Sequence, residues 1–199
     1  SINVDDRSAA TAAARHVVEL GHRRIALITG GGTDPDDDSG DWAVSRWRLQ
    51  GWLDVLGPAG IEPRVLRRPD DSQDAGADAV RDLLAGPDRP TAVLCFSDAL
   101  AAGVVLAAED AGLRVPDDLS VVGFDDTPLA RRTRPALSTV HQDPAEKGRL
   151  AAAELADTVR RHRAGEPQRV RHLLLPTELV VRESTAPPPA ADQSIPASR

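Results

Sequence analysis

Short apolar runs alternate with longer segments of helical periodicity between Asp5 and Phe124. The runs are rich in Val, Ile, Leu and Ala and are bounded by Gly, Pro or Asp, which is typical of buried strands. They cover residues 24–28, 91–95 and 119–124, and residues 64–67 predict a weaker strand. The segments between them predict helices at residues 5–20, 42–56, 73–84 and 98–109. This alternation predicts an α/β fold, with a mostly parallel sheet flanked by helices on both faces.

The two ends of the chain carry weaker signals. Ser1 to Val4 has the pattern of a strand end, and a further strand is predicted at residues 137–140, after an arginine-rich loop at 130–134. Asp143 can cap a helix that reaches about Arg163, and residues 168–174 and 178–181 predict two more strands. From Ser184 onward Pro, Ala and Ser dominate, so residues 184–199 are predicted to form a disordered tail.

The stretch Val115–Asp126 combines a turn, a buried strand and an acidic pair, and the rest of the chain is organised around it. Gly123 would let another backbone or a ligand approach the strand closely. Asp125 and Asp126 follow the strand where open α/β sheets bind ligands, and a carboxylate there can accept two hydroxyl hydrogen bonds from a sugar or ribose. In the alternative interpretation, Asp126 caps the next turn and Asp125 is only solvated. Spacing alone does not decide between the two.

Composition narrows the class of protein. The 199 residues include 24 basic and 31 acidic side chains, a net charge of −7, so the chain is a poor candidate for gripping DNA by itself. Cys95 is the only cysteine, which excludes an internal disulfide and fits a reducing, cytoplasmic compartment. No apolar run is long enough to span a membrane, and the N-terminus is no signal peptide. Its abrupt start without a methionine indicates a fragment of a longer protein.

Polar side chains that follow strand ends are the candidates for a binding site, because a doubly wound sheet brings such points to one edge. They belong to the loop at Gly30 together with Arg48, to Asp70–Asp71, to Ser97–Asp98 and to Asp125. Arg48 offers a planar fork for a diol, carboxylate or phosphate, although an exposed helix arginine is the alternative. Ser97 is also expected to cap a helix, and Gln142 suits either a ligand contact or a hinge hydrogen bond.

Motifs for catalysis are missing. The glycines at 30–32 do not complete G-x-G-x-x-G, because position 35 is Pro35, and no phosphate-binding P-loop sequence occurs. Residues 95–99 do not form a G-x-S-x-G elbow, and the five histidines have no metal-ligand spacing. The chain is therefore predicted not to be an enzyme, and no cofactor or metal is expected.

Five ordered motifs carry a family resemblance. They are Gly-His-Arg-Arg-Ile-Ala-Leu-Ile-Thr-Gly at 21–30, Arg-x-x-Gly-Trp at 48–52, Phe-Ser-Asp-Ala-Leu-Ala-Ala-Gly at 96–103, Val-Pro-Asp-Asp-Leu-Ser-Val-Val-Gly-Phe-Asp-Asp at 115–126, and Pro-Ala-Leu-Ser-Thr-Val-His-Gln-Asp at 135–143. Over about residues 1–185 the chain resembles the effector-binding core of the lactose/galactose repressor (LacI/GalR) family of bacterial transcription regulators. The resemblance implies a periplasmic-binding-protein type I-like fold of two lobes that close on a small sugar-like or nucleobase-like effector.

The resemblance also implies a division of the chain. Residues 1–4 would be a remnant of the first lobe or hinge, residues 5–142 the second lobe, and residues 143–183 a crossover helix with terminal strands of a truncated first lobe. The helix-turn-helix head of the family, and most of its first lobe, have no counterpart in this sequence. DNA binding would then depend on a head domain outside this chain.

Site residues are carried over by motif. Those that match ligand-contacting positions of the family are Arg48, Ser97, Asp125 and Gln142. Ser97 departs from the longer amide that is frequent there, and Asp71 falls near a position where some members place an aromatic ring that stacks on a sugar. Trp42 or Trp47 could supply that ring instead.

The sequence thus predicts the effector-sensing domain of a cytoplasmic, repressor-type regulator that binds a small sugar-like ligand. A sugar-binding protein of a transport system is the alternative. A homodimer is expected through the helix at 98–109, with help from the helix at 73–84. The face proposed for this contact comprises Leu100, Ala101, Val104, Ala107 and Ala108. In the alternative interpretation this face packs on the sheet.

Overall fold

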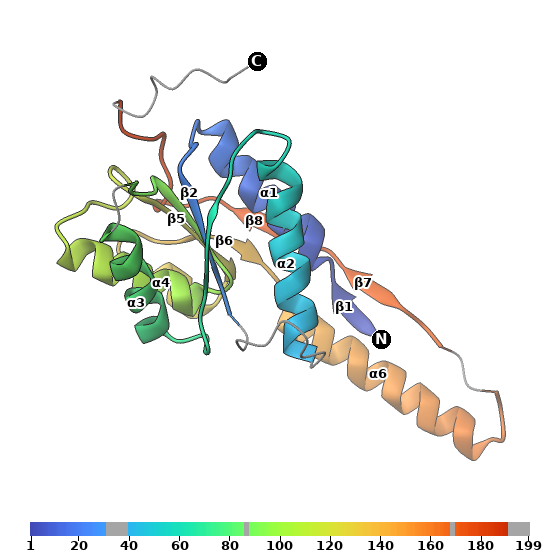
Figure 1. Cartoon of the computed structure of the whole chain (residues 1–199). Coiled ribbons are helices and arrows are strands. Elements are labelled where there is room, and N and C mark those ends of the chain that lie inside the picture. The colour runs from blue at the N-terminus through green and yellow to red at the C-terminus, as the bar shows by residue number, and fades with distance from the viewer. Residues whose placement is uncertain (31–39, 86–87, 168–169, 191–199) are drawn as a thin grey trace.

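The computed structural model describes residues 1–30, 40–85, 88–167 and 170–190, with only the backbone described at residues 40–43. A mixed sheet forms its centre (Figure 1). In the described residues the strand order is β3 (Arg64–Arg67), β2 (Ile25–Thr29), β4 (Ala92–Cys95), β5 (Ser120–Asp125), β6 (Ser138–His141) and β8 (Glu178–Val180). Neighbouring strands run parallel except β8, which pairs antiparallel with β6. The predicted α/β class with a mostly parallel sheet is confirmed.

Helices cover both faces of this sheet, because alternate strand residues point to opposite sides. On one face, Ile25 and Leu27 pack with α1 (Asp6–Glu19) and α2 (Gly40–Leu56). On the other face, Ala26 and Ile28 pack with α3 (Gln73–Leu84) and α4 (Asp98–Asp110). Figure 1 shows the two helix pairs on opposite sides of the strands. The core is filled mainly by Ala, Val and Leu, as the scarcity of aromatic residues requires.

The helices α3 and α4 touch backbone to backbone. A Cβ atom at Gly103 would overlap the carbonyl oxygen of Gln73, and one at Gly76 would overlap that of Leu100. This close approach buries the inner face of α4. All five residues of the face predicted for self-association are buried, namely Leu100, Ala101, Val104, Ala107 and Ala108. The prediction that this face makes the dimer contact is therefore wrong, because it packs on the sheet and on α3.

A second, smaller group of elements extends from the main body. The strands β1 (Ile2–Val4) and β7 (Leu173–Leu175) form a parallel pair, and α6 (Pro144–Arg163) lies next to them. Figure 1 shows α6 projecting away from the sheet. No residue of α6 is buried within the described structure, although Leu155 and Val159 are large apolar side chains. The lobe division proposed for the sequence stays a prediction.

Two local predictions need correction. The strand expected at 168–174 is confined to Leu173–Leu175 in the described residues, since the pairing with β1 extends over three positions only. The arginine-rich segment predicted as a loop contains the short helix α5 (Pro128–Arg132), which begins at a proline in its first turn.

The tail prediction is wrong for residues 184–190. Ser184 is fully buried, accepts a hydrogen bond from the Ser138 backbone N–H (2.8 Å) and donates one to the Val121 carbonyl (2.6 Å). Ser120 and Ala186 exchange two hydrogen bonds of 3.0 Å between hydroxyl and backbone. Polar contacts thus hold the segment to the amino ends of β5 and β6. The sequence did not indicate these contacts, because the segment contains few apolar residues. Residues 191–199 of the predicted tail lie outside the described residues.

Candidate functional site

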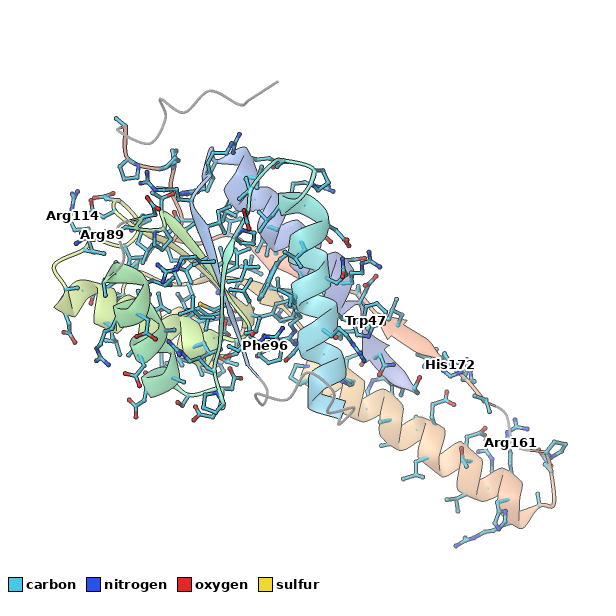
Figure 2. The ribbon with its side chains drawn as sticks, viewed as in Figure 1. Trp47, Arg89, Phe96, Arg114, Arg161 and His172 are labelled. Carbon is cyan, nitrogen blue, oxygen red and sulfur yellow. The ribbon has the colours of Figure 1, made fainter. Side chains whose placement is uncertain are left out.

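The candidate site residues gather at the carboxyl edge of the sheet, at the ends of β4, β5 and β6. Phe96 and Ser97 directly follow β4, Asp125 ends β5, and Gln142 follows β6. Arg48 reaches this edge from α2, and Figure 2 shows Phe96 at the edge of the sheet nearest the start of that helix. Parallel strands with adjacent carboxyl ends explain why residues far apart in sequence meet here.

Arg48 is the centre of the site and is only 5 % exposed. Its Nε donates to Asp6 Oδ1 (2.8 Å), its Nη1 to the Phe96 carbonyl (2.5 Å) and its Nη2 to Asp125 Oδ1 (3.4 Å). The guanidinium also lies over two rings, with its Cζ 3.6 Å from the centroid of Phe124 and 4.4 Å from that of Phe96. A buried cation stacked on aromatic faces and bonded to carboxylates is fixed in one orientation. The alternative of an exposed helix arginine is excluded.

Asp125 has an unusual backbone conformation, with φ at +103°. Residues other than glycine rarely adopt positive φ, and such strain collects at functional sites. The carboxylate is held by Arg48 and by Gln142, whose Nε2 donates to Asp125 Oδ1 at 2.6 Å. Burial raises the pKa of Asp125 to about 6, against the favourable charge of Arg48, and the nearby carboxylates of Asp98 and Asp71 raise it further.

Asp126 has a different role from its neighbour. Its side chain is 3 % exposed and accepts hydrogen bonds from Arg182 Nη2 (2.5 Å) and Arg131 Nη2 (3.1 Å), with His141 Nδ1 at 3.0 Å. Burial opposes ionisation, but the bonds from Arg182 and Arg131 outweigh it and lower the pKa of Asp126. Asp126 does not cap α5, whose N-cap is Thr127. The acidic pair therefore divides, with Asp125 at the site and Asp126 bonded within the protein.

Asp98 is a buried carboxylate that bonds residues next to the site. It is 1 % exposed, and its Oδ1 accepts from the Thr139 hydroxyl (2.5 Å) while its Oδ2 accepts from the Thr127 N–H (2.6 Å) and hydroxyl (2.9 Å). A Cβ atom at Gly123 would overlap Asp98 Oδ1, so this glycine makes room for the carboxylate. The group that approaches the strand at Gly123 is thus a side chain of the protein. Asp98 thus ties α4 to β6 and to the segment that follows β5.

Ser97 and Asp71 form a second polar pair. The Ser97 hydroxyl donates to Asp71 Oδ1 and accepts from the Leu100 N–H at 3.2 Å, so Ser97 caps α4 as the sequence predicted. Burial raises the pKa of Asp71, against the hydrogen bond from Ser97 and the charge of Arg48. The hydrogen bond from Ser97 places Asp71 at the same edge of the sheet as the Arg48 cluster, and the charge of Arg48 acts on the pKa of Asp71.

A cavity of about 470 Å³ is lined by residues of β1, α1, α2, α6 and β7. Asp6 lines it and also bonds Arg48, so the cavity and the polar cluster share a wall. Trp47, 51 % exposed, lines the cavity from α2, and Lys147 lines it from the first turn of α6. Figure 2 shows Trp47 beside α2, on the side toward β1. An aromatic ring and charged side chains around such a space suit a small polar ligand.

The structure brings together most of the site residues predicted from the sequence. Arg48, Asp125 and Gln142 are in contact, and Ser97 with Asp71 forms the adjacent pair. The side chain of Trp42 lies outside the described residues. The role of all these residues in ligand binding stays a prediction.

Sequence reasoning missed three partners of Arg48, namely Asp6, Phe96 and Phe124. A signal was present for the rings, because the chain has only two phenylalanines and each directly precedes a candidate polar residue. Asp6 stands in the first turn of α1, where capping and the helix dipole account for an acidic residue without any pairing.

Clusters of metal-ligating side chains and membrane-spanning helices are both absent from the described ranges. There, no group of three or more His, Cys, Asp or Glu side chains is placed to hold a metal ion. None of the helices described combines the length and apolar character needed to cross a bilayer.

Comparisons with known proteins match the chain to a family model. The model for the periplasmic binding protein-like domain matches residues 14–185. The chain is 36% identical over 187 residues to the HTH-type transcriptional repressor CytR of Escherichia coli K12, covering 93% of this chain and 51% of that repressor. It thus spans about half the length of the curated relatives it matches.

Solved structures with the same fold are also similar. A LacI transcriptional regulator from Bacillus cereus subsp. cytotoxis superposes with a TM-score of 0.83 at 31% identity, over 94% of this chain and 62% of that one. A LacI family regulator from Enterococcus faecium with bound ribose gives a TM-score of 0.80 at 28% identity, over 94% of this chain and 65% of that one.

Proposed function

This chain belongs to the periplasmic binding protein-like domain family, in the branch of LacI-type transcription regulators, and we propose that it is the effector-sensing part of such a regulator. The observation that carries the proposal is the buried Arg48, fixed between two rings and two carboxylates beside a strained Asp125. Such an arrangement costs folding free energy, and a binding role explains why it is kept.

The effector is a small sugar-like molecule. Asp125 and Gln142 present oxygen atoms to its hydroxyl groups, while Arg48 holds Asp125 in position. The cavity beside Asp6 takes the rest of the ligand, with the Trp47 ring as an apolar wall for a sugar face. Support comes from the Enterococcus regulator with bound ribose and from a ribose operon repressor of Haemophilus influenzae, which is 36% identical over 174 residues.

A regulator is favoured over the alternative of a transport protein. The curated relatives to which the chain was compared are named as repressors or regulators of transcription. The proposed protein is cytoplasmic and is not an enzyme. Its operator contacts come from a separate helix-turn-helix head, since a net charge of −7 opposes binding of this part to DNA. A gel shift at low salt is expected to show no sequence-specific retardation of operator DNA by this chain. Such retardation would contradict the assignment of effector sensing to this chain and of DNA binding to a separate head.

The chain forms a homodimer through the outer face of α4. Leu106 is 54 % exposed there and lines a cavity of about 340 Å³ together with Val105 and with Leu129 of α5. An exposed leucine beside a hollow with a partly apolar lining is typical of a contact surface. In sedimentation experiments Leu106→Glu should dissociate the dimer, whereas Leu155→Glu on α6 should leave it intact. A chain that sediments as a monomer before any substitution would contradict this assignment.

Binding is tested by thermal unfolding in the presence of D-ribose and D-glucose, because a ligand that binds the native state raises the unfolding temperature. At least one of these sugars should raise it for the unchanged chain. Arg48→Lys should abolish the increase, since an ammonium group cannot reproduce the planar fork. Arg15→Lys, an exposed position on α1, is the matched control and should respond as the unchanged chain does. Equal responses of the two variants would remove Arg48 from the site.

A further inference from the structure

The hydrogen-bond donors at the proposed effector site are largely engaged within the protein. Three of the five N–H groups of Arg48 point to Asp6, Phe96 and Asp125, and the guanidinium is enclosed by two rings. The single O–H of Ser97 is given to Asp71. Gln142 uses its Nε2 on Asp125. Among the described residues, these three side chains thus keep only two N–H groups of Arg48 and one of Gln142 to offer to a ligand.

Acceptor atoms remain open at the same edge. In the part of the chain that the structure describes, Asp125 Oδ2, Asp71 Oδ2 and Gln142 Oε1 accept no hydrogen bond from the protein. Asp71 is exposed as a residue, while its carboxylate is partly desolvated against Ser97, so the free oxygen can still reach a ligand directly. The pKa values of Asp71 and Asp125 are both raised, first by burial, which agrees with a local shortage of donors and positive charge. A ligand that supplies hydroxyl or ammonium donors would relieve this shortage.

The neighbouring cavity does not supply the positive charge that the cluster lacks. Lys147 and Arg7 line it, but so do Asp5 and Asp6, and Arg7 is paired with Asp54 at 2.6 Å. One basic side chain therefore faces two carboxylates, of which Asp6 is already bonded to Arg48. An anionic group on the ligand would meet carboxylates at both the cluster and the cavity.

We propose that the effector is an uncharged or cationic polyhydroxy compound, such as a free sugar or an amino sugar, and that Asp71 is the residue that selects it against phosphorylated or carboxylated sugars. This inference rests on the proposed function, because it takes the Arg48–Asp125 cluster as the effector site. Asp71 acts in place of Ser97, which the sequence motif would assign to the ligand and whose hydroxyl Asp71 occupies. The Asp71 carboxylate accepts a hydrogen bond from a hydroxyl or ammonium group of the ligand and repels an anionic group.

The test compares four probes by thermal unfolding and calorimetric titration: D-glucose, D-glucosamine, glucose 6-phosphate and D-gluconate. For the unchanged chain, the first two should bind and the two anions should bind at least about tenfold more weakly. Asp71→Asn keeps an oxygen that can accept from Ser97 but removes the charge. It should lower the affinity ratio of glucosamine over glucose 6-phosphate by about tenfold, because a charge-assisted bond and a repulsion are lost together.

Asp88→Asn is the matched control, since Asp88 is an exposed carboxylate that precedes β4 at the opposite edge of the sheet. It should leave the affinity ratio unchanged. Preference of the unchanged chain for either anion, or an unchanged ratio in Asp71→Asn, would overturn the role of Asp71 while leaving the effector site in place. If none of the four probes binds, with Arg48→Lys behaving as the unchanged chain does, both this inference and the proposed function fail.

Discussion

Replacing Asp125 by asparagine should stabilise the unliganded protein at neutral pH. The pKa of Asp125 is raised to about 6 from an ordinary value of 3.8, so the folded protein binds this proton more tightly than the unfolded chain does. A carboxyl group of this kind destabilises the fold above its folded pKa, and the penalty is relieved as the pH falls from about 6 toward 4. Asparagine is neutral at every pH and can still accept hydrogen bonds from Gln142 and Arg48.

The magnitude follows from the pKa and the exposure. A shift of about two pKa units corresponds to about 3 kcal/mol. The Asp125 side chain is 33% exposed, and solvent screening reduces the figure to about 1–2 kcal/mol. Denaturant unfolding should therefore give Asp125→Asn a free energy of unfolding about 1–2 kcal/mol above that of the unchanged chain at about pH 7.5. At about pH 4.5 this advantage should fall to roughly a third of its neutral value.

The exposed Asp88, which precedes β4 at the opposite edge of the sheet, provides the control. Asp88→Asn should track the unchanged chain at both pH values. The reasoning is refuted if Asp125→Asn is no more stable at neutral pH, or if its advantage does not shrink as the pH falls. Either result would mean that Asp125 is not desolvated beside Asp98 and Asp71.

Three further predictions concern stability and are checked by the same unfolding measurement. Gly103→Ala should destabilise by about 2 kcal/mol or more, since its Cβ overlaps the Gln73 carbonyl, whereas Gly148→Ala on the open face of α6 should be neutral or stabilising by up to about 1 kcal/mol. Asp126→Ala should destabilise by about 3 kcal/mol because it leaves the Arg182 guanidinium without its buried carboxylate, and a loss below about 1 kcal/mol would contradict the network. Ser184→Ala should cost about 1–3 kcal/mol through two lost hydrogen bonds, and no loss would mean that the terminal segment does not hold β5 to β6.

The fold was predictable because the strands are short apolar runs with clear boundaries. The segments at 64–67 and 73–84 match β3 and α3 to the residue, since Pro, Gly and the N-cap Ser72 mark their limits. The burial of the inner face of α4 was not predictable. Small residues at helical spacing suit a dimer contact and a core contact equally, and only the overlap of Gly103 with Gln73 distinguishes them.

The sequence predicted which residues form the site, but it did not predict the hydrogen bonds among them. Position after a strand identified Asp125 and Ser97, since parallel topology brings such residues to one edge. The sequence could not reveal that Asp125 and Asp126 point to different partners, because this depends on positive φ at both residues. Nor could it show that Ser184 is buried, because its contacts are with backbone groups more than 40 positions away.

The central claim, that the Arg48–Asp125 cluster binds the effector, is tested most directly by a nuclear magnetic resonance titration of the isotope-labelled chain with D-ribose and D-glucose. Backbone amide signals of Ser97, Asp125 and Gln142, and the Arg48 Nε–H signal, should shift with a single saturation curve. Signals of Gly112 and Gly165, which lie in turns after α4 and α6, should not move. Shifts confined to residues away from the carboxyl edge, or no saturable shift with either sugar, would contradict the account.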